Sequence, residues 1–355
     1  YPICVDANAG EIVHDIKIFK VENEKLAYPD LNSPASTTPY IEDGRIYVFF
    51  GTYGTACIDT KTGEKLWERR DLHCDNRIRP ASSPVIDGGA LFLHFDGVDV
   101  QFVAALNKHT GETIWLKDRD VYTTLEETLR KGGASDEDIA ETERDKPGDN
   151  RKSSATPTVI EVNGEKQLIS PGAEVTFSYN PETGDENWHV EHEGLGWNVA
   201  CRPIYEDGIL YFTTGIARLL YAIDPTGSGD ITGTDKHLWT VKGRTPEIPS
   251  PIVVDGLLIM VNDSGGSTTC LDTKTGEQIW RKRLPSGGTY WASPVYADGK
   301  IYCSSAKGTI TVIEAGREFN VLAENEFDAA FYASPAVRGD QLIIRSETHL
   351  YSFAH

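Results

Sequence analysis

The chain has 355 residues, of which 39% are hydrophobic and 25% charged, and its formal net charge at pH 7 is −20. This composition can fill a sizeable core, and the acidic balance argues against binding to a nucleic-acid backbone, which requires clustered Lys and Arg. No apolar run approaches the roughly 18 residues that a membrane-spanning helix needs. The chain begins at Tyr1 without a signal peptide, which leaves its compartment open.

One phrase recurs along the chain and predicts its architecture. It is most regular at Cys57–Trp67 (CIDTKTGEKLW). Further copies occupy Ala105–Trp115, Ser178–Trp188 and Cys270–Trp280, and looser ones occupy Cys4–Val13 and Ala222–Trp239. A repeat with a period of a few tens of residues indicates a solenoid, a propeller or an array.

A second phrase precedes each copy, as in Thr38–Tyr47 (TPYIEDGRIY) and Ser293–Tyr302 (SPVYADGKIY). Asp-Gly between two apolar runs predicts a β-hairpin, because both turn residues must adopt positive φ. The Thr-Gly-Glu step of the first phrase predicts a second hairpin. Each unit therefore has four short strands, which we name A to D in chain order, and such units are typical of β-propeller blades.

Taken in chain order, the repeats predict an all-β chain that forms one propeller domain over residues 1–355. Six complete units are expected at 33–72, 80–120, 153–193, 199–243, 248–284 and 290–327. Residues 331–355 supply only three strands of a seventh, and Gly10–Ile16 fits the missing fourth strand, so the two termini would close the last blade. Seven blades are predicted; eight would apply if residues 1–32 formed more than one strand.

Two insertions interrupt this regularity. Residues 121–147 are expected to be helical, because Leu125–Lys131 follows a capping Thr124 and Ser135–Asp138 has a capping-box pattern. The segment is either a solvated excursion or a lid over a site. The second insertion, Asp224–Asp235, loosely matches a calcium loop. An extended C–D hairpin without metal is the preferred interpretation.

The six cysteines indicate packing rather than a metal site. Cys4, Cys57 and Cys270 share one strand C slot that other units fill with Ala or Ser. Free Cys often serves as a small hydrophobe. Disulfides among Cys74, Cys201 and Cys303 stay open, and no spacing resembles that of a zinc site.

The alternation of Ser-Pro-x-x-x-Asp-Gly-x-Ile-Tyr with x-x-Asp-x-x-Thr-Gly-Glu-x-x-Trp resembles the pyrroloquinoline-quinone-like repeat propellers over nearly the whole chain. The resemblance implies that the strand D tryptophans dock between blades. These are Trp67, Trp115, Trp188, Trp239 and Trp280.

For function, the resemblance points in two directions, to quinoprotein dehydrogenases and to non-catalytic outer-membrane assembly lipoproteins. The dehydrogenases carry adjacent cysteines near their cofactor, and this sequence has no Cys-Cys pair. We therefore expect no cofactor and no metal, and keep pyrroloquinoline quinone with calcium as the alternative.

In a propeller, the D-to-A and B-to-C loops share one face around the central channel, so we expect any ligand there. The candidate ligand-binding residues on this funnel face are Arg77, Arg79, Asp96, Arg151, Glu174, Trp197, Asn198, Arg202, Asp263, Tyr290, Trp291 and Tyr332. Aromatic side chains among arginines and carboxylates suit sugars, peptides or anionic small molecules. The alternative is that the aromatics plug the channel and the charges pair with one another.

The sequence shows no nucleophile constellation and no phosphate loop. The acidic charge and the resemblance favour an exported bacterial protein, periplasmic or extracellular, and we expect it to be monomeric. The lack of catalytic motifs favours a protein that holds a protein segment or a small ligand such as a carbohydrate without catalysis. The alternative is an enzyme at the funnel, either a quinoprotein-type oxidoreductase or a carbohydrate-active protein. Asp96 with Glu174 or Asp263 could then form a carboxylate pair.

Overall fold

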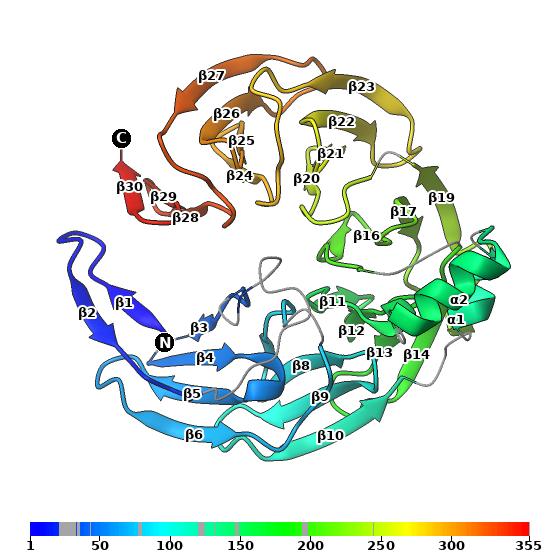
Figure 1. The fold of residues 1–355 in the computed structure, drawn as a ribbon, viewed down its shortest axis with the longest axis horizontal. Helices are drawn as coiled ribbons and strands as arrows, with labels where there is room; N and C mark the ends of the chain where they lie inside the picture. The colour runs from blue at the N-terminus through cyan, green and yellow to red at the C-terminus, as the bar shows by residue number, and fades with distance from the viewer. Residues whose placement is uncertain are drawn as a thin grey trace. The chain divides into compact units, whose positions relative to one another are not determined.

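A computed structural model describes residues 1–20, 33, 36–42, 44–76, 80–119, 125–131, 133–145, 149–193, 198–243 and 245–354. Within these ranges the chain forms seven sheets of three to five strands and one two-stranded hairpin (Figure 1). The fold is a seven-blade β-propeller whose blades are mainly four-stranded. The chain divides into two compact units, one of residues 1–202 with 226–234 and one of residues 203–225 with 235–355.

The first unit holds the N-terminal hairpin and three blades. The hairpin joins β1 (Ile3–Val5) and β2 (Ile12–Asp15). The first blade is β3 (Tyr40–Glu42), β4 (Arg45–Phe49), β5 (Thr55–Asp59) and β6 (Lys65–Arg69), with the 3-10 turn η1 (Gly51–Tyr53). The second is β7 (Val85–Asp87), β8 (Ala90–Asp96), β9 (Gln101–Asn107) and β10 (Thr113–Asp118). The third is β11 (Thr158–Val162), β12 (Glu165–Pro171), β13 (Val175–Tyr179) and β14 (Glu186–Glu191), extended by β18 (Gly229–Asp230).

The second unit holds four blades. The fourth blade is β15 (Ile204–Glu206), β16 (Ile209–Thr213), β17 (Leu219–Ile223) and β19 (His237–Lys242). The fifth is β20 (Ile252–Val254), β21 (Leu257–Val261), β22 (Ser267–Asp272) and β23 (Gln278–Arg283). The sixth is β24 (Val295–Ala297), β25 (Lys300–Ser304), β26 (Thr309–Glu314) and β27 (Val321–Glu326). The seventh is β28 (Ala336–Arg338), β29 (Gln341–Arg345) and β30 (Leu350–Ala354).

The hairpin turns have the geometry that the repeat predicts. Asp255 and Gly256 lie between β20 and β21 with φ of 49° and 74°, and Asp298 and Gly299 between β24 and β25 have 49° and 71°. Two consecutive positive φ values match the right-handed twist of the flanking strands, and Asp-Gly supplies them at low cost. The A–B hairpin prediction is confirmed at these turns.

The strand D tryptophan of one blade docks on the C–D turn of the next. Trp239 in β19 donates its indole N–H to the carbonyl of Thr273 at 3.2 Å. Gly276 of the same turn has φ +71°, and a Cβ there would come within 2.7 Å of the Trp239 ring. Trp67 with Lys108 (2.9 Å), Trp115 with Pro181 (3.0 Å) and Trp280 with Gly316 (3.0 Å) make the same bond. The Gly of the repeat therefore lets the turn receive the indole of the preceding blade.

Trp188 departs from this pattern. Its side chain is fully buried and donates to Oε1 of Gln167, in its own blade, at 3.0 Å. The segment Thr226–Thr234 belongs to the same compact unit, and its short strand β18 pairs in parallel with β14, with Gly229 opposite Trp188. The insertion expected as an extended hairpin thus adds a fifth strand to the third blade.

The acidic side chains of this insertion are engaged locally. Asp224 forms an ion pair with Lys236 at 2.8 Å, and Asp230 accepts the backbone N–H of Thr232 at 2.9 Å. Across the described part of the chain, no three His, Cys, Asp or Glu side chains gather as metal ligands would.

The described strands of the last blade are β28, β29 and β30, and β2 pairs with β1, with Cys4 opposite His14. Asp6 accepts the N–H groups of Asn8 and Ala9 and closes the same tight turn that Asp59 closes in the first blade. The closure of the seventh blade by Gly10–Ile16 stays a prediction.

The predicted helical insertion is present as α1 (Leu125–Lys131) and α2 (Asp136–Asp145), followed by the 3-10 turn η2 (Asp149–Arg151). The predicted capping box is formed, because Ser135 Oγ accepts the Asp138 N–H at 3.2 Å and the Asp138 carboxylate accepts the Ser135 N–H at 3.0 Å. Leu129 and Ile139 pack between the helices. Thr124 lies outside the described residues, and neither helix is long and apolar enough to span a membrane.

All six cysteines are free thiols. Cys57 and Cys270 lie opposite Trp67 and Trp280 in their sheets, as the shared slot predicts. Cys74, Cys201 and Cys303 are buried without forming a disulfide, whereas Cys4 is exposed. Packing is therefore the role of the five buried thiols.

Candidate functional site

The structure describes nine of the twelve predicted site residues. Arg77, Arg79 and Trp197 lie outside the described ranges. The first unit carries Asp96, Arg151, Glu174, Asn198 and Arg202, and the second carries Asp263, Tyr290, Trp291 and Tyr332.

Asp96 forms a buried ion pair that joins the second and third blades. It ends β8, and its carboxylate accepts from Arg119, which directly follows β10. Arg119 is 1% exposed and also donates to Ser170 Oγ at 3.2 Å and to the carbonyl of Pro171 at 3.4 Å. Burial raises the pKa of Asp96 to about 6, although the charge and hydrogen bond of Arg119 act in the opposite direction. Arg119 was not among the predicted site residues, because no short-range sequence pattern links it to an acidic residue 23 positions earlier.

The loops that carry Arg151 and Asn198 run side by side. Ser153 and Val199 form a parallel bridge, and the Ser154 N–H donates to the carbonyl of Val199 at 2.7 Å. Asn198 adopts φ +58°, in the left-handed region that Asn tolerates better than most residues. The structure thus brings these two predicted residues onto neighbouring segments.

Arg202 and Glu174 also lie in the third-blade region. Arg202 donates through Nε to Thr158 Oγ1 at 2.8 Å, which holds its guanidinium at the start of β11. Glu174 lies between β12 and β13, and its carbonyl accepts the N–H of His192 at 2.7 Å.

In the second unit, Asp263 belongs to a charge cluster centred on Arg218. Arg218, in the loop between β16 and β17, donates to the Asp263 carboxylate at 2.9 Å and approaches Glu247 at 3.4 Å. It also reaches Asn262 Oδ1 at 3.2 Å, and the Glu247 N–H donates to Asp263 at 2.9 Å. Burial alone would raise the pKa of Asp263, but the hydrogen bonds from Arg218 and from backbone N–H groups outweigh it and the pKa lies below its usual value. The cluster joins the fourth and fifth blades.

Trp291 and Tyr332 form an aromatic pair. Their ring centroids are 5.3 Å apart with the planes tilted by 43°. Tyr332 is 45% exposed and Trp291 half-buried. They lie in the loops that follow β23 and β27. Two loops distant in the sequence therefore present one partly exposed aromatic surface.

The residue that precedes each member of the aromatic pair is buried and holds its loop in place. Tyr290 is 1% exposed, and its hydroxyl lies 2.7 Å from Ser286 Oγ, while Phe331 is fully buried. Each loop thus buries one aromatic residue and exposes the next. Tyr290 belongs to the core of the second unit rather than to an open surface.

Lys307 lies beside the loop that carries Trp291. A Cβ on Gly288 would lie within 2.9 Å of the Lys307 side chain, so the stem of Lys307 passes close to the loop that carries Trp291. The backbone fixes the approach, because the Ala306 N–H donates to the carbonyl of Thr289 at 2.9 Å. Lys307 was not among the predicted site residues, because its Lys-Gly turn resembles the other turns of the repeat.

Comparison with known proteins places this geometry in a family. A family model described as "Outer membrane protein assembly factor BamB" matches residues 4–126 and 228–347. The chain belongs to this family. Among solved structures, that of BamB from Moraxella catarrhalis aligns over 89% of this chain and 81% of its own, with a TM-score of 0.62 and 14% identity. A europium-containing methanol dehydrogenase aligns over 86% and 72%, with a TM-score of 0.61 and 12% identity. At such identities the likeness shows the fold alone.

A curated enzyme matches a shorter segment. Quinoprotein ethanol dehydrogenase of Pseudomonas putida is 42% identical over 81 residues, which are 22% of this chain and 12% of the enzyme. The chain therefore spans far less than two thirds of that relative.

The resemblance assigns adjacent cysteines to the quinone site of such enzymes. The sequence has no adjacent cysteines, and the buried thiols are packing groups whose pKa values are raised by burial, to about 12 for Cys303 and about 11 for Cys270. The carboxylates Asp96 and Asp263 are held by arginines.

Proposed function

We propose that this protein is an exported, non-catalytic binding propeller, periplasmic or extracellular, that holds a segment of another polypeptide against the surface formed by Trp291, Tyr332 and Lys307. The aromatic pair carries the proposal. Large aromatic side chains that stay partly exposed on an otherwise packed framework are the residues that most often dominate binding energy at protein interfaces. Membership of the assembly-factor family supports a protein partner.

Preorganisation supports the same role. Because Tyr290 and Phe331 are buried, the loops that present Trp291 and Tyr332 are fixed before a partner arrives. A partner then loses less conformational freedom on binding than it would against mobile loops. The ammonium of Lys307 favours a segment with an acidic residue beside its apolar contact.

The state of the carboxylates supports binding over catalysis. Asp96 and Asp263 each accept hydrogen bonds from an arginine. A glycoside hydrolase needs two carboxyl groups that face one substrate bond, one of them free to donate a proton. These two carboxylates serve instead to join neighbouring blades.

A quinoprotein-type oxidoreductase is the second candidate, favoured by the 42% identity to quinoprotein ethanol dehydrogenase. This second candidate predicts that the protein binds the quinone cofactor. Thermal melting with pyrroloquinoline quinone and calcium would raise the melting temperature if the native state bound them, because a ligand of the native state stabilises it by mass action. Glucose and cellobiose serve as the carbohydrate arm of the same screen.

Site-specific photo-crosslinking tests the proposed function. A photoreactive amino acid at position 332, in cells that express the protein, should give a discrete adduct with another polypeptide. Trp291→Ala should abolish that adduct, and the same probe at Leu322, which is 46% exposed in the same unit, serves as the control. No adduct at 332, an adduct unaffected by Trp291→Ala, or a thermal shift with quinone or sugar that Trp291→Ala removes would each contradict the proposal.

A further inference from the structure

A polar cavity of about 860 Å³ lies within the first unit, where the third blade meets the second blade and the insertion that carries β18. Its walls come from the turns that follow β7, β11 and β13, from the start of β14 and from Thr226–Ser228. The volume is within the range of small-molecule sites, roughly 300–1,000 Å³. None of the described residues of the predicted funnel site lines this cavity.

A chain of hydrogen bonds within the third blade fixes one wall of the polar cavity. The side-chain amide of Asn187 donates to Ser178 Oγ at 3.0 Å, and Ser178 donates to Gln167 Oε1 at 2.9 Å. The same oxygen accepts the indole N–H of Trp188, and Gln167 is only 8% exposed. Asn187 and Gln167 line the cavity, so this wall is in place before a ligand arrives. Oδ1 of Asn187 accepts no hydrogen bond from the described residues and can accept one from a ligand.

Hydrogen-bond donors also line the polar cavity. Lys166 Nζ donates to both carboxylate oxygens of Asp87, at 2.7 and 3.0 Å, and joins the third blade to the second. Asn180 Oδ1 accepts the N–H groups of Glu182 at 2.8 Å and Thr183 at 3.3 Å. The side-chain N–H groups of Asn180 meet no acceptor among the described residues, so they can donate to a ligand.

This mixture of groups decides which class of ligand the polar cavity suits. The carboxylates of Asp87, Glu165, Glu182 and Glu186 would repel an anion, and the ammonium of Lys166 would repel a simple cation. A hydroxyl group both donates and accepts, so it can pair with the carboxylates, with Asn187 Oδ1 and with the Asn180 amide alike. A neutral compound with several hydroxyl groups therefore matches the lining.

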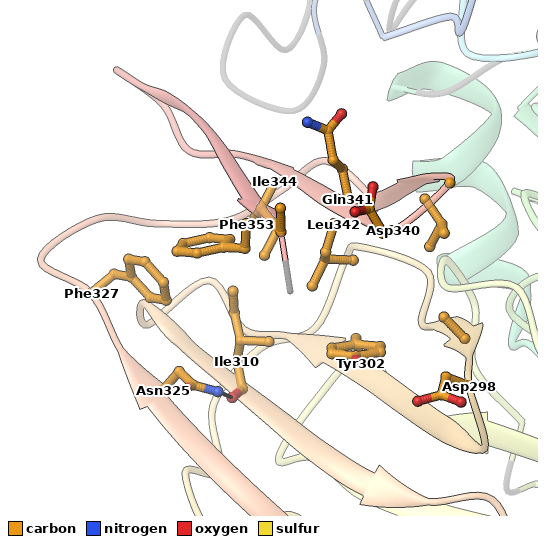
Figure 2. Close-up of a pocket in the computed structure, with 14 residues that line it drawn as sticks. Asp298, Tyr302, Ile310, Asn325, Phe327, Asp340, Gln341, Leu342, Ile344 and Phe353 are labelled. Carbon is orange, nitrogen blue, oxygen red and sulfur yellow. Dashed lines mark hydrogen bonds between the residues drawn. The ribbon is translucent and has the colours of Figure 1, made fainter. Parts of the chain in front are cut away.

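Another cavity, of about 440 Å³ between the sixth and seventh blades, has a contrasting lining. Figure 2 shows Tyr302, Phe327 and Phe353 around it, together with Ile310 and Leu342. Such walls suit apolar groups. Among the described residues that line the polar cavity none is aromatic, so a ligand there is held by hydrogen bonds rather than by stacking on a ring.

We propose that the polar cavity binds a neutral carbohydrate, with the side-chain amide of Asn180 donating to one hydroxyl and Oδ1 of Asn187 accepting from another. The carboxylates of Glu165 and Glu182, which also line the cavity, accept from further hydroxyls. This site shares no residue with the surface of Trp291, Tyr332 and Lys307, so it stands whether or not the proposed function holds.

Calorimetry on the full chain with three trisaccharides, maltotriose, cellotriose and triacetylchitotriose, tests the proposal. At least one of them should bind with a dissociation constant of about 1 mM or lower. Asn180→Asp should weaken that binding at least about tenfold, because a carboxylate keeps the acceptor of the turn but donates no hydrogen bond. The variant should fold, since Asp59 closes the equivalent turn of the first blade by accepting the N–H groups of Lys61 and Thr62 at 2.8 and 2.7 Å.

Asn107→Asp is the matched control. Asn107 closes the same turn in the second blade, where its Oδ1 accepts the His109 N–H at 2.9 Å, and it does not line the cavity, so binding should be unchanged. Ser228→Trp, at an exposed position that lines the cavity, should abolish binding by filling the space. No binding of any trisaccharide, equal weakening by the substitutions at 107 and 180, or full binding after Ser228→Trp would overturn the proposal. Spermidine that binds, and binds more tightly after Asn180→Asp, would also overturn it, because the cavity would then be a cation site.

Discussion

Replacing Gly276 by alanine should destabilise the second unit through two separate effects. Gly276 has φ +71°, and an added Cβ would lie 2.7 Å from both Cδ2 and Cε3 of Trp239. Gly256 of the same blade has nearly the same φ, +74°, but its added Cβ would meet only Thr273 Oγ1 at 3.8 Å. The two positions share the backbone effect and differ in the steric one.

The magnitudes follow from this comparison. An L-residue in the left-handed region costs about 1–2 kcal/mol, which both variants incur. Overpacking a well-filled contact costs a further 1–3 kcal/mol or so, and only Gly276→Ala incurs it because its ring neighbours belong to another blade. Gly256→Ala should therefore lose about 1–2 kcal/mol and Gly276→Ala about 2–5 kcal/mol.

Equilibrium urea unfolding followed by far-ultraviolet circular dichroism measures both losses. The midpoint should fall further for Gly276→Ala at an unchanged slope, which reports stability alone. In a Trp239→Leu background the difference between the two glycine variants should disappear. Equal losses in the wild-type background would refute the role assigned to the glycine of the repeat.

Three further outcomes are expected. Trp280→Ala should lower the free energy of unfolding by about 3–5 kcal/mol, and Trp280→Phe by less, since the phenyl ring keeps most of the buried area. An unchanged melting temperature in the alanine variant would count against docking between blades. Because folding lowers the pKa of Asp263, its carboxylate stabilises the native state above the unfolded pKa near 3.8, and this contribution is lost as the pH falls further. The destabilisation caused by Asp263→Asn should thus be larger at pH 7 than at pH 3, and a pH-independent difference would argue against the pairing with Arg218. Ser135→Ala should reduce stability of the α1–α2 segment by about 0.5–2 kcal/mol, read as faster amide exchange in α2, and equal exchange would remove the capping role.

The repeat made the local elements predictable. Asp298-Gly299 specifies its turn through backbone conformation alone, and Ser135 with Asp138 specifies a helix start through two neighbouring hydrogen bonds. Such features depend on residues a few positions apart, so the sequence contains all the information they need. The helical insertion was found for the same reason.

Features that depend on distant partners were not predictable in this way. The pattern places Trp188 with the other docking tryptophans, but β18 lies opposite it and its N–H turns to Gln167. Tyr290 and Trp291 lie in the same predicted loop, and their place in it did not reveal that Tyr290 is buried while Trp291 is partly exposed. In each case the deciding contact comes from a segment that the local pattern does not describe.

The parallel pairing of β18 with β14 has a consequence for biosynthesis. Synthesis proceeds from the N-terminus at about 5–20 residues per second, so Trp188 leaves the ribosome before the strand that lies opposite it exists. During that interval the outer edge of β14 is open to other chains. The third blade can reach its final form only after Gly229–Asp230 has emerged, and slower translation between these segments would lengthen its exposure to chaperones and to misassembly.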